Sequence, residues 1–207
     1  MPRFRTTAIA ALAATALLAT SGAAYARDLH LKKVEREASA APSMAWAYFA
    51  GTLTDISSPG TPNVYRGARA TAMMIGIDNT TFVKVQIKGL GENAIGKELG
   101  AHLHTGPCGL DTAKPPQPTV GGHYNTDTVK GITPALVSDQ TEVWLNFDVN
   151  SDGNAKATAT VPFVPTADDR SITFHERATT KSGVGVGTAG AKLACLPLDI
   201  KSVKSSN

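Results

Sequence analysis

The chain has few aromatic residues, few cysteines and no strong excess of charge of either sign. Phe, Trp and Tyr make up 6% of its 207 residues, and no basic stretch is interleaved with aromatic side chains. The formal net charge is +3 and becomes 3 − 2 = +1 without Arg3 and Arg5 of the first segment. Such a weak charge gives no reason to predict a nucleic-acid partner. No apolar run is long enough to span a bilayer, so no membrane span is predicted.

The first 26 residues have the pattern of a secretory signal peptide. They begin with basic residues, continue with an apolar stretch through about Leu18, and end with an Ala-Tyr-Ala cleavage sequence at Ala26. The sequence therefore predicts a protein that is secreted, or exported to the periplasm or the cell-envelope exterior. Residues 27–43 are charged, then small and polar, and predict a flexible stalk. The remaining residues, 44–207, fit one domain.

The pattern after the stalk is typical of β-strands, and no segment shows a sustained helical period. Val83, Val85 and Ile87, for example, alternate with polar residues, which indicates a strand with one buried and one solvated face. The predicted strands are 45–56, 69–78, 80–90, 99–104, 143–149, 155–161, 170–175 and 191–197. We therefore expect an all-β fold, a Greek-key antiparallel β-sandwich or flattened barrel of about eight strands.

The connections between these strands are of two kinds. Asn150-Ser151-Asp152-Gly153 is a turn sequence and predicts a hairpin between the strands on either side of it. Two connections are much longer, 105–141 and 176–190. Because long loops in a compact domain are often functional, we expect both to contribute to a site.

Four of the five histidines form a pattern typical of a metal site. His102 and His104 are two residues apart, so on a strand both side chains point to the same face. His123 and His175 can join them from a loop and from a later strand. Neutral imidazole suits copper, zinc, iron or nickel, and the lack of acidic or thiolate partners in a fixed pattern favours copper. The alternative is four histidines with ordinary hydrogen bonds.

Cys108 and Cys195 are the two cysteines of the chain, and each lies close in sequence to one of these histidines. In an oxidising compartment, two cysteines most simply form one disulfide.

The motifs GAHLHTGPCG, GGHYN, SITFHER and GTAGAKLACLPL, in this order, resemble the secreted copper–zinc superoxide dismutase family. The resemblance implies a sandwich fold and conversion of superoxide to oxygen and hydrogen peroxide by Cu(II)/Cu(I) cycling. Cys108 and Cys195 take the positions of the family disulfide, and Lys192 replaces the arginine that guides the superoxide anion. The copper ligands implied by the resemblance are His102, His104, His123 and His175.

The chain departs from this family at the second metal site. Residues 124–142 contain no histidine, and Gln140 and Val143 stand where the last zinc histidine and the zinc aspartate are expected. Thr179 stands at the position of the aspartate that connects the two metal sites in the family. These departures together predict a copper-only protein without zinc.

Two functions follow from this sequence. The first is a copper-dependent superoxide dismutase, with superoxide as its partner and a monomeric or weakly dimeric state. The second is a secreted copper-binding, buffering or delivery protein that uses the same site without significant turnover. The rate of reaction with superoxide distinguishes the two.

Overall fold

The computed structural model describes residues 44–113, 115–166 and 168–200. The predicted signal peptide, residues 1–26, and the predicted stalk, residues 27–43, lie outside these described residues. The described part is almost entirely β-structure, as the alternating pattern predicted.

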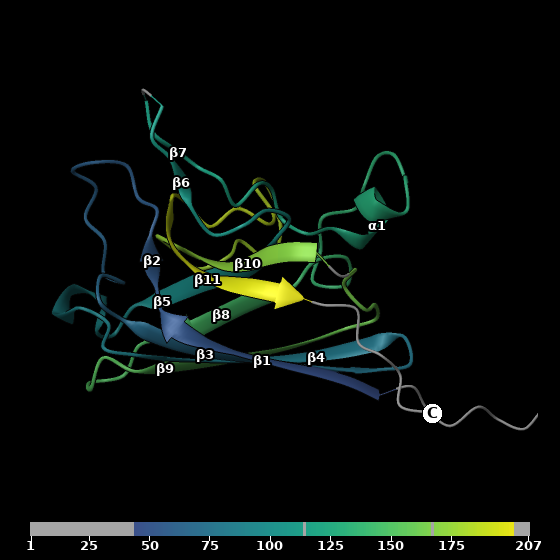
Figure 1. Ribbon diagram of the computed structural model, residues 1–207, viewed down its shortest axis with the longest axis horizontal. Helices are drawn as coiled ribbons and strands as arrows, with labels where there is room; N and C mark the ends of the chain where they lie inside the picture. The colour runs from purple at the N-terminus through teal and green to yellow at the C-terminus, as the bar shows by residue number, and fades with distance from the viewer. Residues whose placement is uncertain (1–43, 114, 167, 201–207) are drawn as a thin grey trace, which may run out of the picture. The chain divides into compact units, whose positions relative to one another are not determined.

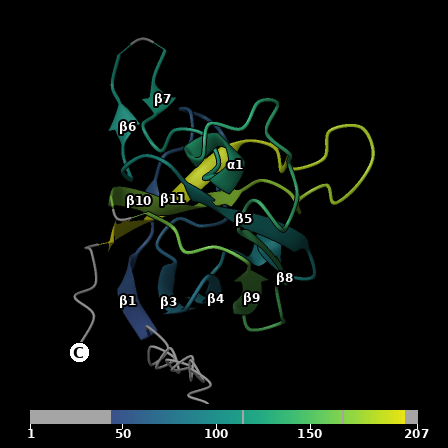
Figure 2. The same cartoon turned by 90° about the vertical axis from the view of Figure 1, so that its right-hand side faces the viewer.

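Two antiparallel sheets pack face to face, as the end-on view in Figure 2 shows. The first sheet has the strand order β1-β3-β4-β9, and its strands are β1 (Met44–Thr52), β3 (Arg69–Ile77), β4 (Thr80–Lys88) and β9 (Ala155–Val161). The second has the order β2-β11-β10-β5-β8, with β2 (Thr54–Asp55), β11 (Lys192–Ile200), β10 (Asp168–His175), β5 (Glu98–His104) and β8 (Trp144–Asp148). The predicted β-sandwich is confirmed.

The hydrophobic core lies between the two sheets. Val83, Val85 and Ile87 of β4 are each at most 1% exposed, and they meet Leu99, Ala101 and Leu103 of β5 in one buried cluster. The alternation of apolar and polar residues therefore decides which face of each strand is buried. On β5 this places the even-numbered residues, including both histidines, on the face turned away from the core.

Two local predictions were wrong. The predicted strand 45–56 is divided at Leu53, because β1 belongs to the first sheet and β2 to the second. The turn at 150–153 does connect β8 and β9, but these strands lie at the edges of different sheets and do not form a hairpin. Short-range patterns identify a turn, whereas the sheet that each strand joins depends on its contacts with residues far away in the sequence.

The long connections lie over the second sheet, on the side away from the first (Figure 1). The connection 105–141 contains the short strand pair β6 (Leu110–Asp111) and β7 (Gln117–Pro118) and a single helical turn, α1 (Thr126–Val129). A 3-10 helix at Glu92–Ala94 lies in another connection. Among the described residues, no helix is both long and apolar enough to cross a membrane.

Candidate metal centre

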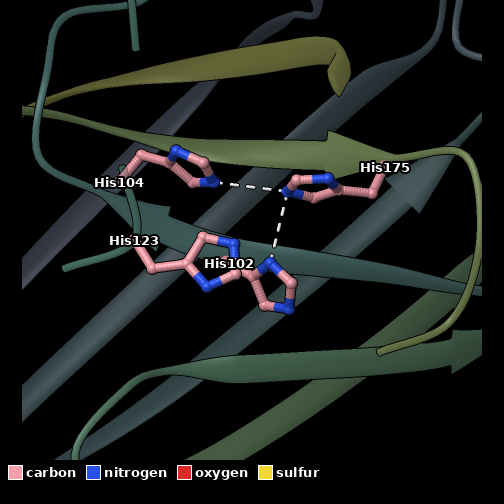
Figure 3. A group of neighbouring side chains, drawn as sticks. All are labelled: His102, His104, His123 and His175. Atoms are coloured by element: carbon pink, nitrogen blue, oxygen red, sulfur yellow. Dashed lines mark hydrogen bonds between the residues drawn. The ribbon is translucent and has the colours of Figure 1, made fainter. Parts of the chain in front are cut away.

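The four predicted histidines meet on the outer face of the second sheet. His102 and His104 project from β5, His175 ends the neighbouring strand β10, and His123 forms an isolated antiparallel bridge with His104. One nitrogen from each imidazole lies within 4.8 Å of the others. Figure 3 shows the four rings turned toward a common centre. These side chains are placed to hold a metal ion, and within the described residues they are the one such group found.

The distances between the inner nitrogens suit a first-row metal. His175 Nε2 lies 3.2 Å from His102 Nδ1 and 3.2 Å from His104 Nε2. Metal–imidazole bonds of about 2.0–2.1 Å at near-tetrahedral angles place two ligand nitrogens roughly 3.3 Å apart. The all-imidazole donor set is compatible with copper, and it does not by itself distinguish copper from other metals of this kind.

Backbone carbonyls hold the outer nitrogens of two of the rings. His104 Nδ1 donates to the carbonyl oxygen of Gly121 at 3.1 Å, and His175 Nδ1 contacts that of Gly190 at 3.4 Å. A carbonyl oxygen can only accept a hydrogen bond, so in both rings Nδ1 carries the proton. Nε2 of each ring then keeps its lone pair and faces the centre of the group.

Side chains hold the outer nitrogens of the other two rings. His102 Nε2 lies 2.8 Å from the Thr179 hydroxyl, and His123 Nδ1 donates to Glu142 Oε2 at 2.8 Å. His102 therefore presents Nδ1 to the centre, whereas His123 presents Nε2. Such outer partners orient metal-binding imidazoles and raise their basicity.

Burial keeps three of the imidazoles neutral. His102, His104 and His175 are at most 2% exposed, and burial lowers the pKa of all three, to about 4 for His175. Neighbouring imidazole charges lower these pKa values further. The three rings are therefore uncharged at neutral pH, which is the form that binds a metal.

Glu142 is the one residue of the candidate site that the sequence pattern did not indicate. It is 4% exposed, and burial alone would raise its pKa, but hydrogen bonds from His123, Trp144 and Asn125 hold the pKa below its ordinary value. Glu142 is therefore a buried carboxylate bonded to one of the four clustered histidines. In the sequence it stands two residues before β8, where a lone glutamate resembles an ordinary strand end.

The loop that carries His123 can approach β5 because of a glycine. Gly121 has φ +70°, and a Cβ atom there would lie 2.5 Å from the Thr105 hydroxyl oxygen. Only glycine combines this conformation with this close approach. The same loop is tied to the sandwich by the predicted disulfide between Cys108 and Cys195, which is confirmed.

Lys192, the predicted anion-guiding residue, lies beside the histidines. It begins β11 and pairs with His175 after a register shift between Phe174 and His175. This bulge brings the two residues opposite each other, a use of bulges that is common near functional sites. Lys192 Nζ donates to the Gly121 carbonyl oxygen at 2.7 Å, the same atom that accepts from His104.

The two residues at the expected zinc-ligand positions lie outside the histidine cluster, whereas Thr179 lies against it. Gln140 is exposed and donates to Asp139, and Val143 is buried in the core. Thr179 is 5% exposed and bonds to His102, as described above.

The fold and the site together define a β-sandwich protein with a candidate metal centre of four histidines. No protein-family model matches the chain, and neither does any curated protein. What the centre does must therefore be judged from its own residues and their geometry.

Proposed function

We propose that the chain is a secreted, copper-dependent superoxide dismutase. The observation that carries this proposal is the set of four convergent imidazoles, each with its outer nitrogen hydrogen-bonded and its inner nitrogen turned to the centre. The order of the motifs around these histidines resembles the copper–zinc superoxide dismutase family, and the β-sandwich fits that resemblance.

Imidazole ligands suit copper in both of its common oxidation states. When bound, copper supplies a one-electron Cu(II)/Cu(I) couple, so that two superoxide ions and two protons give one oxygen and one hydrogen peroxide. The hydrogen bonds that His104 and His175 donate to backbone carbonyls keep the lone pairs of both rings directed inward. The protein thus holds its ligands in place without rearrangement.

Lys192 would attract the anionic substrate. Burial is the main cause of the lowered pKa values of His104 and His175, and the charge of Lys192 lies close enough to lower both values further. Burial also lowers the pKa of Lys192 itself. A cation at the edge of a metal centre raises the local concentration of an anion such as superoxide. Lysine lacks the planar fork of arginine, so we expect it to attract superoxide without orienting it tightly.

Glu142 supports a copper-only centre. A histidine that bridges two metals must leave both ring nitrogens free for them. The Nδ1 of His123 is instead bonded to the buried Glu142 carboxylate, which also accepts from Asn125 and Trp144. His123 would then act as a terminal ligand, and zinc would be unnecessary. The disulfide between Cys108 and Cys195 is compatible with the oxidising compartment that secretion implies.

The test is pulse radiolysis of the mature, copper-loaded chain, with His104→Ala as the control. We expect superoxide to decay at a rate approaching roughly 10⁸–10⁹ M⁻¹s⁻¹ and the control to lose this activity. Stoichiometric copper binding with no faster decay than in the control would reject the dismutase. That result would favour the copper carrier or buffer.

A further inference from the structure

Two side chains on the outer face of β8 hold the residues that in turn hold two of the copper-ligand histidines. Trp144 contacts Glu142, which contacts His123. Asn146 contacts Thr179, which contacts His102. We propose that Trp144 and Asn146 are positioning residues that fix the orientation of His123 and His102 and, through the Glu142 carboxylate, the protonated nitrogen of His123. The inference rests on the proposed copper site, but it does not require dismutase activity.

The first arm, the chain of hydrogen bonds from Trp144 to His123, passes through the buried carboxylate of Glu142. The indole N–H of Trp144 donates to Glu142 Oε2 at 2.8 Å, and His123 Nδ1 donates to the same oxygen at 2.8 Å. Asn125 Nδ2 donates to Oε1 at 3.1 Å. Hydrogen bonds to a charged acceptor are stronger than neutral ones, and a buried carboxylate that loses a donor is penalised by desolvation. The indole N–H therefore helps to keep Oε2 where His123 needs it.

The second arm, the chain of hydrogen bonds from Asn146 to His102, passes through the backbone of Thr179 in the connection between β10 and β11. Asn146 Oδ1 accepts from the Thr179 backbone N–H at 3.0 Å, and Asn146 Nδ2 donates to the Thr179 carbonyl at 3.4 Å. Asn146 Nδ2 also donates to Glu98 Oε1 at 3.3 Å. One amide side chain thus contacts both backbone polar groups of Thr179. It thereby fixes the hydroxyl that lies 2.8 Å from His102 Nε2.

The register of the sheet explains why β8 carries both arms. Trp144 is paired with His102 and Asn146 with Gly100, so these four residues share the outer face of β5 and β8. Glu142 lies near the end of the connection between β5 and β8, Thr179 lies in the connection between β10 and β11, and both connections cover this face. A regular strand holds side chains more rigidly than a loop does. β8 is thus the fixed element to which both loops are attached.

Trp144 and Asn146 face a groove open to solvent and not the core of the sandwich. Trp144 and Asn146 line a groove of about 250 Å³ between β8 and β9, together with Thr158, Thr160 and Lys181. The core-facing residues of β8 are instead Leu145 and Phe147. Substitutions at Trp144 and Asn146 should therefore act on the hydrogen bonds to the loops and leave the packing of the sandwich intact.

The experiment for the first arm compares Trp144→Phe with Trp46→Phe. Trp46 lies on β1 and is 67% exposed, so its substitution is a matched control. Long-range ¹H–¹⁵N NMR of the metal-free protein reports which nitrogen of each imidazole carries the proton. We expect His123 to be protonated on Nδ1 in the wild type and in the control, and to become a mixture of tautomers in Trp144→Phe.

A second measurement follows copper itself. The Cu(II) EPR spectrum should change in Trp144→Phe, and the copper affinity should fall by less than the roughly 10–100-fold that is usual when the directly bonded outer partner, here Glu142, is itself lost. Asn146→Ala should loosen the orientation of His102 and thereby change the Cu(II) EPR spectrum and lower the copper affinity. Its control is Asn93→Ala, on the exposed surface of the 3-10 helix.

The proposal is overturned if Trp144→Phe and Asn146→Ala leave the tautomers, the EPR spectrum and the copper affinity equal to those of their controls. The wild-type spectrum is already a test, because a His123 protonated on Nε2 would contradict the first arm even if Trp144→Phe failed to fold. Failure of the proposed function looks different. A wild type that binds copper without dismutase activity, while its variants still show these shifts, would reject the dismutase and retain the positioning role.

Discussion

Replacing Gly100 by alanine should disturb the candidate metal centre without contacting any of its four histidines. Gly100 lies on the outer face of β5, where the connection after β10 passes very close to the sheet. A Cβ atom at this position would lie 3.0 Å from the Arg177 carbonyl oxygen, 3.0 Å from Thr179 Oγ1 and 3.1 Å from Thr179 N. Two of these three atoms belong to the backbone, so rotating one side chain cannot relieve the contact.

The size of the effect follows from these distances. Ordinary contacts of a Cβ atom begin at 3.4 Å, so the loop must move by 3.4 − 3.0 = 0.4 Å. If the whole movement separates Thr179 from His102, their hydrogen bond lengthens from 2.8 Å to 2.8 + 0.4 = 3.2 Å. Overpacking costs about 1–3 kcal/mol, and the lower chain entropy of alanine returns about 0.4–1 kcal/mol. We expect a net loss of about 1 kcal/mol, or about 2–4 °C in Tm.

The assay combines thermal unfolding with the EPR spectrum of bound Cu(II). Gly76→Ala is the matched control, because Gly76 is also a buried strand glycine but its added Cβ would meet its neighbours at ordinary distances of 3.7 to 3.9 Å. We expect Gly100→Ala to melt earlier than the control and to show an altered copper spectrum. If both variants have the same Tm and the same spectrum as the wild type, the loop is not held against β5 as described.

Three further predictions concern other parts of the chain. Cys108→Ser opens the disulfide to Cys195, which closes a separation of 87 residues, and urea unfolding should show a loss of up to about 4–5 kcal/mol; an unchanged midpoint would contradict this. Burial alone would raise the pKa of Asp55. Hydrogen bonds, of which the one from Arg66 has the largest effect, instead lower this pKa from 3.8 to about 2. The resulting stabilisation is present above pH 3.8 and lost as the pH falls through 2, so Asp55→Asn should flatten this part of the stability profile by less than about 1 kcal/mol. An unaltered profile would show that the carboxylate contributes nothing. Lys192→Gln should slow superoxide decay by roughly tenfold and weaken its dependence on salt, whereas Lys192→Arg should preserve both; equal rates for the two variants would argue against anion guidance.

Local patterns in the sequence were sufficient for much of the fold. The alternation in β4 predicted which side chains are buried, because successive side chains on any strand point to opposite faces. The spacing of His102 and His104 placed both on one face for the same reason. The division at Leu53 could not be predicted in this way, since the residues on both sides of it have strand character and differ only in the sheet that they join.

The sequence by itself determined the four histidines, the two cysteines and the β-sandwich, because each depends on residue type and short-range period. The tertiary structure alone decided which partner each imidazole has on its outer side. Glu142 lies 19 positions from His123, and Thr179 lies 77 positions from His102. Hydrogen bonds over such separations follow no local pattern, because they form only when the sheet register and the path of two long loops bring the atoms together.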